Sequence, residues 1–230
     1  MVCQPNSGAA ANCNTIHNVL LDTGSYGLRL FASMVPSGTL SAMTPQTQGS
    51  NNVAECGLFV SGYTWGGVRN ADIKLGTEVA TNVPVQIIGD ANISASAPSE
   101  CQIGTAMTTP SAAFANGILG VGVAPADCGA ACAGSAASSN YYTCPGGLSS
   151  TTCTAPTVQV SQQVANPVPH FATDNNGVIL ELPQVSDAGQ ASASGTLVFG
   201  IGTAANNAMT ASQQFQTTQW GDLVGSTFNG

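Results

Sequence analysis

The stretch Asn18-Val-Leu-Leu-Asp22-Thr23-Gly24-Ser25-Tyr26-Gly27-Leu28 carries one aspartate between two apolar runs. Each run predicts a β-strand, and Gly24 allows a sharp turn between them. We expect this turn to hold the carboxylate of Asp22 at a strand end, with the hydroxyls of Thr23 and Ser25 as donors to it. The competing interpretation is an ordinary Asx-type turn in a hairpin, for which the same residue types are typical.

Turn residues divide the rest of the chain into short apolar segments, since 27 glycines and 12 prolines are spread along it. Strands separated by turns at this spacing predict an all-β sandwich or barrel. Two stretches, 127–137 and 158–164, could each form a short helix. We expect strands at 16–21, 28–31, 57–60, 83–88, 117–123, 178–182 and 196–201.

Charge limits the classes of partner. Only 3 of the 230 residues are Lys or Arg, against 11 Asp or Glu, and the net charge is -8. A nucleic-acid partner is excluded, because the chain has almost no cations to neutralise phosphates. No run of about 18 apolar residues occurs, so we expect no membrane span.

The chain has eight cysteines, an even number that predicts four disulfides and an extracytoplasmic location, either secreted, periplasmic or on the cell surface. A zinc site on the last four is the alternative, but these four lack the spacing typical of zinc ligands and have no histidine nearby. We expect Cys3–Cys13 and Cys56–Cys101 to pair, and the last four to pair among themselves in an order that the sequence leaves open. The last four are Cys128, Cys132, Cys144 and Cys153.

Several catalytic and cofactor signatures are absent from the sequence. It contains no Gly-x-Ser-x-Gly elbow and no phosphate-binding Gly-x-x-x-x-Gly-Lys motif. His17 and His170 lie in no recognisable catalytic signature, so we expect surface or hydrogen-bonded roles for them. We therefore expect neither a cofactor nor a metal.

The segment around Asp22 resembles the active-site turn of pepsin-like aspartic peptidases. Two later segments follow in the same order as in that family: Asn116-Gly-Ile-Leu-Gly-Val-Gly122, which resembles the strand beside the catalytic turn, and Ser194-Gly-Thr-Leu-Val-Phe-Gly200, which resembles the strand that closes the first lobe. Between the Asp22 turn and the first of these segments, Gly62-Tyr-Thr-Trp-Gly66 stands where the family has its flap hairpin. The resemblance implies a pepsin-like lobe, a strongly bent β-barrel or sandwich with few short helices.

The same resemblance implies a site. It consists of the catalytic Asp22, the supporting turn Thr23, Gly24 and Ser25, the flap residues Tyr63, Thr64 and Trp65, and the packing segment Ile118, Leu119 and Gly120.

The sequence also resembles a bacterial family catalogued as domain of unknown function 3443. That resemblance implies an exported bacterial protein with an aspartic-peptidase-like fold and no established substrate. The matching segments are Asp22-Thr-Gly-Ser-Tyr-Gly-Leu-Arg29, Asn116-Gly-Ile-Leu-Gly-Val-Gly122, Asp174-Asn-Asn-Gly-Val-Ile-Leu180 and Leu197-Val-Phe-Gly-Ile-Gly-Thr203.

The chain departs from the peptidase pattern in two places. Arg29 stands where pepsin-like enzymes usually have tryptophan, and a second Asp-Ser/Thr-Gly motif is absent. Asp174-Asn-Asn-Gly177 is the nearest substitute and is expected to be a plain turn, while Asp222 has no such turn.

Aspartic peptidases need two carboxylates that share one proton. We therefore expect residues 1–230 to be one lobe of a longer protein, inactive alone, with 206–230 beginning the connection to a second lobe. The absence of an export signal at Met1-Val-Cys-Gln-Pro5 also favours a trimmed chain. The expected partners are a peptide substrate and a second lobe or a second copy.

Two other classes remain open. The chain could be a non-catalytic exported binding module on an acid-protease fold, because fold does not determine function. It could also be a surface structural module held together by disulfides.

Overall fold

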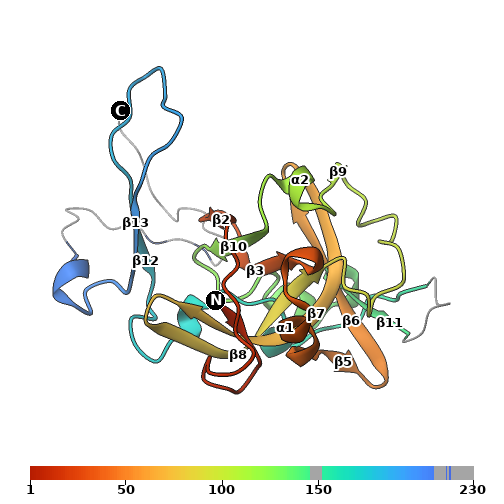
Figure 1. Ribbon diagram of the computed structural model, residues 1–230. Helices are drawn as coiled ribbons and strands as arrows, with labels where there is room; N and C mark the ends of the chain where they lie inside the picture. The colour runs from red at the N-terminus through yellow and green to blue at the C-terminus, as the bar shows by residue number, and fades with distance from the viewer. Residues whose placement is uncertain (146–151, 210–215, 217, 219–230) are drawn as a thin grey trace.

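Eleven strands form one sheet in the part of the chain that this computed structural model describes, which comprises residues 1–145, 152–209, 216 and 218 (Figure 1). The main path of the sheet runs β11-β6-β7-β8-β3-β10-β2, while β1, β4 and β9 pair with β7 and β5 pairs with β6. The strands are β1 (Val2–Cys3), β2 (Val19–Asp22), β3 (Tyr26–Phe31), β4 (Thr44–Pro45), β5 (Thr47–Gln48), β6 (Asn51–Phe59), β7 (Gly62–Leu75), β8 (Glu78–Ile88), β9 (Thr105–Ala106), β10 (Gly117–Val121) and β11 (Tyr141–Cys144).

Helices are few and short. The described α-helices are α1 (Ser37–Ala42), α2 (Pro110–Ala113) and α3 (Ala130–Gly134). Each expected strand overlaps an observed one, and the predicted all-β class is confirmed. Single 3-10 turns lie at Ala32–Met34, Ala136–Ser138, Val160–Gln162, Val168–His170 and Ala205–Asn207.

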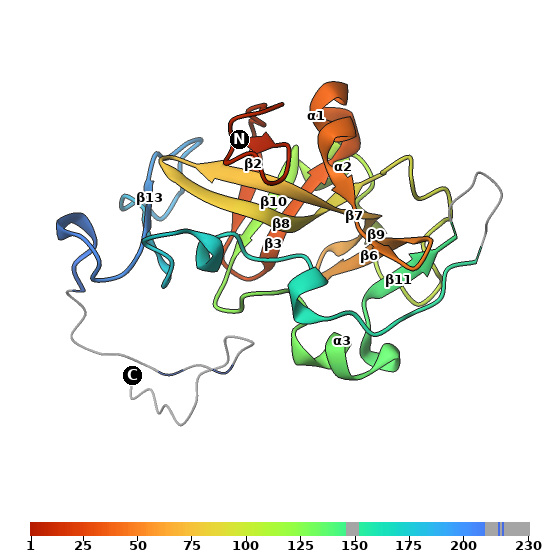
Figure 2. The same cartoon turned by 90° about the horizontal axis from the view of Figure 1, so that it is seen from below.

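Of the two expected architectures, sandwich or barrel, the described residues do not form a closed barrel. Strand β2 pairs on one side only, with β10, and β11 pairs on one side only, with β6. The sheet is therefore open, because its first and last strands do not meet (Figure 2).

The helix expected at 158–164 is also wrong, since only Val160–Gln162 forms a 3-10 turn there. The buried amide of Gln163 holds this stretch in place instead. Its Nε2 donates to the carbonyl oxygens of Val158 (2.9 Å) and Gly129 (2.8 Å), and its Oε1 accepts from the N–H of Gly129 (2.6 Å). The Gln163 side chain thus satisfies the carbonyl oxygen of Val158, which a helix would have paired with a backbone N–H, and it ties this stretch to Gly129.

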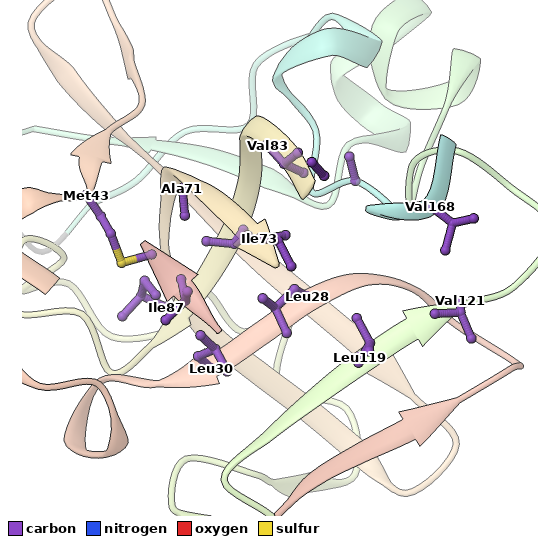
Figure 3. Packing of buried hydrophobic residues seen from close by; sticks show 14 of the residues in the cluster. Leu28, Leu30, Met43, Ala71, Ile73, Val83, Ile87, Leu119, Val121 and Val168 are labelled. Carbon is purple, nitrogen blue, oxygen red and sulfur yellow. The ribbon is translucent and has the colours of Figure 1, made fainter. Parts of the chain in front are cut away.

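The main hydrophobic core covers one face of the sheet (Figure 3). Leu28 and Leu30 of β3 contribute to it, as do Leu119 and Val121 of β10. Successive side chains of a strand point to opposite faces. The residue between the two leucines, Arg29, therefore points away from this core.

A two-stranded sheet, β12 (Val178–Glu181) with β13 (Thr196–Phe199), projects from the main sheet (Figure 1). Phe199 of β13 packs edge-on against Phe171, with the ring centroids 5.1 Å apart. This hairpin is thus attached to the core at its base.

All eight cysteines are in disulfides, and the predicted pairs are confirmed. Cys3 pairs with Cys13 and Cys56 with Cys101, while the last four pair as Cys128–Cys132 and Cys144–Cys153. The zinc alternative is therefore wrong. Four disulfides are typical of an oxidising, extracytoplasmic environment. Within the residues described, no helix has the length and apolar character needed to cross a membrane.

The N-terminal loop is attached to β7 through one buried carboxylate, Asp72. Its oxygens accept the backbone N–H groups of Asn6 (2.8 Å), Ser7 (2.8 Å), Ala9 (3.0 Å) and Asn82 (2.8 Å). Burial alone would raise the pKa of Asp72, but these four donors together hold it below its ordinary value. The loop closed by the first disulfide is thus fixed to the sheet.

Candidate functional site

The Asp22 turn connects β2 to β3, and strand β10 lies between these two strands in the sheet. Strand β10 pairs in parallel with β2, with Gly120 opposite Asp22, and antiparallel with β3, with Gly120 opposite Gly27. The expected neighbours Ile118 and Leu119 occupy the same strand. The loop from β2 to β3 must therefore pass across the β10 end.

Two glycines make this crossing possible. A Cβ atom added to Gly120 would lie 2.5 Å from the backbone N of Tyr26, and one on Gly122 would lie 2.9 Å from the carbonyl oxygen of Thr23. The N–H of Gly122 donates to the carbonyl oxygen of Ser25 at 2.9 Å. The sequence Gly120-Val-Gly122 is thus required by the close approach of backbone at the Asp22 turn.

The carboxylate of Asp22 is held by a backbone donor. The N–H of Gly24 donates to its Oδ1 at 2.8 Å. The expected hydroxyl donors are arranged differently: Thr23 is exposed, and the buried Oγ of Ser25 makes no hydrogen bond to any described residue. Asp22 itself is half-buried, so one of its faces is open to an approaching group.

A groove of about 820 Å³ opens at Asp22. One wall is the tip of the β6–β7 hairpin, and another is α2 with the exposed ring of Phe114. Asp22 is the one ionisable side chain in the lining. The groove is lined by Leu20, Asp22, Gly24, Ser25, Leu58, Phe59, Val60, Ser61, Thr105, Met107, Ala112, Ala113, Phe114 and Ile118.

The expected flap residues lie in the β6–β7 hairpin, but Tyr63, Thr64 and Trp65 do not line the groove. Tyr63 and Trp65 pack against a second hydrophobic cluster, and the indole N–H of Trp65 donates to the carbonyl oxygen of Ala95 at 2.9 Å. Thr64 points to the other face, where its Oγ1 donates to Gln86 at 2.7 Å. The aromatic ring that this hairpin contributes to the groove is Phe59, which the sequence analysis missed.

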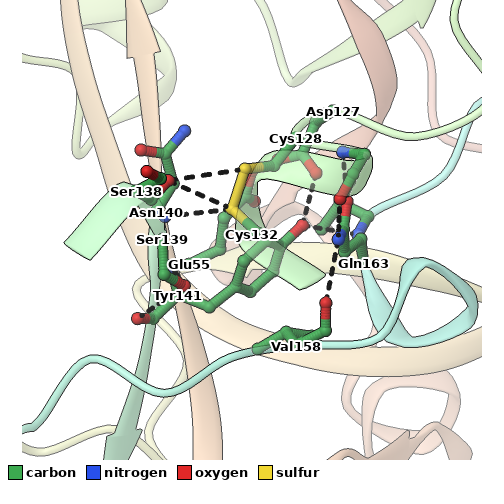
Figure 4. The surroundings of a disulfide bond; sticks show 12 residues. Glu55, Asp127, Cys128, Cys132, Ser138, Ser139, Asn140, Tyr141, Val158 and Gln163 are labelled. Carbon is green, nitrogen blue, oxygen red and sulfur yellow. Dashed lines mark hydrogen bonds between the residues drawn. A yellow bond between two sulfur atoms is a disulfide. The ribbon is translucent and has the colours of Figure 1, made fainter. Parts of the chain in front are cut away.

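A buried cluster of charged residues lies on the far side of the turn. Arg29 of β3 is 3% exposed, and its guanidinium donates through Nη2 to Glu55 of β6 and, at 3.2 Å, to Asp127. Its Nη1 donates to the carbonyl oxygen of Tyr26 at 2.8 Å, which connects the cluster directly to the Asp22 turn. The hydroxyl of Tyr141 donates to the second oxygen of Asp127 (Figure 4).

The cluster holds one cation and two carboxyl groups, and burial makes this arrangement pH-sensitive. Burial raises the pKa of Glu55 well above its ordinary value, and Asp127 adds to this effect while Arg29 opposes it. Burial also raises the pKa of Tyr141 well above its ordinary value, with Asp127 adding to it. Burial alone would lower the pKa of Arg29, but its two carboxyl partners raise it. A protonated Glu55 leaves the cluster electrically neutral.

A small polar cavity of about 130 Å³ separates this cluster from the groove. Its lining shares Gly24, Ser25, Leu58 and Phe59 with that of the groove. Arg29 also lines it, and the Nε of this guanidinium has no hydrogen-bond partner among the described residues.

Sequence reasoning missed Glu55, Asp127 and Tyr141. One signal could have found the cluster: Arg29 interrupts the apolar run Leu28-Arg-Leu-Phe31, and a buried arginine requires a carboxylate partner. Which carboxylate would meet it was not readable, because Asp127 lies 98 positions away along the chain.

The remaining candidates lie elsewhere. Asp174 lies in a bend before β12 with a positive φ of 51°, and it accepts a hydrogen bond from the hydroxyl of Thr203. His17 and His170 are both exposed. Among the described residues no group of three or more His, Cys, Asp or Glu is arranged to hold a metal ion. Asp222, and most of the expected connection at 206–230, lie outside the described residues.

Comparison with known proteins gives one match. Neither the search of curated proteins nor the search of solved structures returns a match to this chain. The family model described as "Protein of unknown function (DUF3443)" matches residues 1–230, the whole sequence, and the chain therefore belongs to that family.

Proposed function

We propose that the chain is one pepsin-like lobe of an aspartic endopeptidase, with Asp22 as its catalytic carboxylate. The observation that carries this proposal is the position of Asp22. Its carboxylate is oriented by the N–H of Gly24 at the edge of an apolar groove, and a β-hairpin forms the opposite wall. An extended peptide can lie in such a groove with its backbone near the carboxylate.

The proposed reaction is hydrolysis of a peptide bond by water. An ionised carboxylate removes a proton from the water as it attacks, and a protonated carboxylic acid polarises the peptide carbonyl. Asp22 supplies one of these two groups. Glu55 and Asp127 do not supply the other, because both are engaged with Arg29. A second lobe or a second copy must therefore provide it.

The dyad must carry one proton, so cleavage is expected at acid pH and is lost above the higher apparent pKa of the pair. The test is cleavage of an unfolded protein substrate by the full-length gene product between pH 3 and pH 7. Asp22→Asn should abolish cleavage, while the matched control Asp174→Asn, which also changes an aspartate in a turn, should retain it.

The monomeric 230-residue chain should show no turnover. Cleavage that persists in Asp22→Asn, or turnover by a strictly monomeric chain, would overturn the proposal. Circular dichroism of each variant separates loss of activity from loss of fold.

A non-catalytic exported binding module is the second candidate. The observation that favours it is the single ionisable group in the groove. In that case the full-length protein binds extended peptides in the groove without cleaving them, and Asp22→Asn changes affinity and nothing else.

A further inference from the structure

Two carboxyl groups share one cation behind the Asp22 turn. The guanidinium of Arg29 donates through Nη2 to both Glu55 and Asp127, whose side chains are 0% and 8% exposed. The two carboxyl groups also lie within hydrogen-bond reach of each other. A hydrogen bond between them needs a proton on one, because two carboxylates can only accept. The cluster is therefore arranged to hold one proton.

The elements packed around this pair bring no second cation among the described residues. Strand β3 contributes Arg29, and β11 contributes Tyr141, whose hydroxyl is a neutral donor. Strands β7 and β8 contribute the neutral side chains of Thr64 and Gln86, which are hydrogen-bonded to each other at 2.7 Å. The adjoining segment 158–166 has no ionisable side chain. Loss of the shared proton therefore leaves an uncompensated negative charge in a buried site, which is costly.

The two acids differ in how firmly their backbone is held. Glu55 lies within β6, which pairs with β7 on one side and with β11 on the other. Asp127 lies in the segment 122–129, which connects β10 to α3 and has one isolated bridge, from Ala126 to Ala165. The side chain of Asp127 also lines the small cavity of about 130 Å³. A second negative charge is therefore relieved most easily by movement of Asp127 toward this cavity.

The segment 122–129 touches the Asp22 turn at one end and a disulfide at the other. The N–H of Gly122 donates to the carbonyl oxygen of Ser25 at 2.9 Å. Cys128, the residue after Asp127, is fixed by its bond to Cys132 (Figure 4). Movement of Asp127 is therefore passed back along the segment to Gly122 and the turn, rather than forward to α3.

We propose that residues 122–129 form a proton-operated clamp on the Asp22 turn. With one proton shared by Glu55 and Asp127, the segment is fixed against β6 and the turn beside the groove is ordered. Without that proton, Asp127 turns away from Glu55, and the contact between Gly122 and Ser25 loosens. The clamp regulates the groove at Asp22, but it does not rest on the proposed peptidase function, because it needs no cleavage.

The direction of the pH dependence follows from burial. Burial raises the pKa of Glu55 well above its ordinary value, and Asp127 adds to this effect while Arg29 opposes it. The pair therefore keeps its proton at a pH at which an exposed glutamate, with an ordinary pKa of about 4.3, has lost its own. Because the two acids interact, the transition belongs to the pair. The clamp is thus set in acid and released as the pH rises.

Two signals are followed from pH 4 to pH 8, one for the proton and one for the clamp. A sample labelled with ¹³C at the glutamate side-chain carboxyl gives four carboxyl signals, and the loss of one in Glu55→Gln assigns Glu55, which should titrate at the highest pH of the four. The glutamates are Glu55, Glu78, Glu100 and Glu181.

The clamp is read from hydrogen exchange of the Gly122 N–H, corrected for the intrinsic pH dependence of exchange. Its protection should fall by about tenfold or more with the same midpoint as the Glu55 titration. The N–H of Asn14, which donates to the carbonyl oxygen of Val2 at 2.9 Å, is the internal control and should keep its protection.

Variants connect the two signals. Glu55→Gln keeps the clamp set, because the amide accepts from Arg29 and donates to Asp127 without titrating, so Gly122 should stay protected up to pH 8. Glu100→Gln changes an exposed glutamate and should leave the transition as it is. Asp127→Asn leaves one carboxyl group with one cation and should move the Glu55 midpoint to lower pH, which provides a second reading if Glu55→Gln does not fold.

Three results overturn the proposal: constant protection of Gly122 from pH 4 to pH 8, a midpoint for Glu55 no higher than those of the other glutamates, or a transition that persists unchanged in Glu55→Gln. Asp22→Asn should keep the transition, which separates the clamp from titration of Asp22 itself. If the transition occurs while the full-length protein cleaves nothing, the clamp stands and the peptidase proposal fails. Cleavage without any transition overturns the clamp alone.

Discussion

The two arginines of this protein are both buried, but they are paired in different ways. Arg69 meets Asp90 alone: its Nε and Nη2 donate to the two carboxylate oxygens at 2.6 and 2.8 Å, and its Nη1 donates to two backbone carbonyls. Arg29 meets two carboxyl groups, Glu55 and Asp127, and leaves its own Nε without a partner among the described residues.

The difference distinguishes a structural ion pair from a candidate site. The Arg69 pair is balanced in charge and its hydrogen bonds are satisfied, so a substitution in it can only lower stability and leaves no group to bind a ligand. The Arg29 cluster has one carboxyl group too many, a free donor and a cavity that connects it to the groove at Asp22. Unsatisfied polar groups and shifted pKa values gather at sites that bind or react.

The largest effect is expected from breaking the ion pair of Arg69 with Asp90. Arg69→Met leaves Asp90 buried without its cation and should lower the free energy of unfolding by about 3–5 kcal/mol. Urea unfolding at pH 7 measures the loss. Arg69→Met combined with Asp90→Asn should recover part of it, because the uncompensated charge is gone. A loss below about 1 kcal/mol in the single variant would contradict the description of this pair as structural.

A smaller effect is expected from removing the cation of the Arg29 cluster. Arg29→Met should cost about 2–3 kcal/mol at pH 7, less than Arg69→Met, because the raised pKa of Glu55 makes its protonation easy once the cation is gone and Asp127 keeps the hydrogen bond from Tyr141. The cost should shrink as the pH falls. Without the arginine, which opposes the effect of burial, the folded-state pKa of Glu55 rises further, and such a shift gives stability below the unfolded value of about 4.3 that is lost at higher pH. Equal losses in the free energy of unfolding for Arg29→Met and Arg69→Met at pH 7 would contradict the distinction between the Arg29 cluster and the Arg69 pair.

Removing the surplus carboxyl group should stabilise the protein. The folded-state pKa of Glu55 is raised, so its contribution to stability is fully present below the unfolded value and is lost as the pH rises through the folded value. Glu55→Gln removes this loss and should be more stable than the wild type at pH 7, with no difference near pH 3.

Asp72 is the matched control with the opposite sign. Its folded-state pKa is lowered, so its stabilisation is present above the unfolded value and is lost as the pH falls. Asp72→Asn should therefore be less stable than the wild type at pH 7 and converge with it in acid. Urea unfolding from pH 3 to pH 7 measures both variants. A destabilised Glu55→Gln protein at pH 7 would contradict the raised pKa of Glu55.

The smallest effect is expected at the edge of the cavity. Because the Oγ of Ser25 has no partner among the described residues, Ser25→Ala should change the free energy of unfolding by less than about 0.5 kcal/mol. Thr64→Val is the control, because it removes a hydroxyl that makes a buried hydrogen bond to Gln86, and it should cost about 1–3 kcal/mol. A large loss in Ser25→Ala would mean that the hydroxyl supports the turn.

Part of the site could be predicted from local sequence. The Asp22 turn was readable because a strand, a glycine and a second strand follow one another within 11 residues. That Gly120 lies beside the Asp22 turn could be predicted only through family resemblance. The structure gives the physical reason for the glycine, because the backbone of Tyr26 leaves no room for a Cβ atom at position 120. The direction of the flap residues could not be read, because a one-residue change in strand register exchanges the two faces of a hairpin.

The sequence by itself determined the all-β class, the disulfide-rich character, the first two cysteine pairs and the turn that holds Asp22. The class and the turn depend on composition, on turn residues and on side-chain alternation, which act over a few positions. The Cys3–Cys13 pair closes a local loop, whereas Cys56–Cys101 spans 45 positions and was predicted from the cysteine count and order alone. Only the tertiary structure decided that Arg29 meets Glu55 and Asp127, that Phe59 rather than Tyr63 borders the groove, and that the sheet stays open. The physical reason is that these features depend on which buried groups meet across distant strands, and desolvation makes such contacts strong only after the whole sheet has formed.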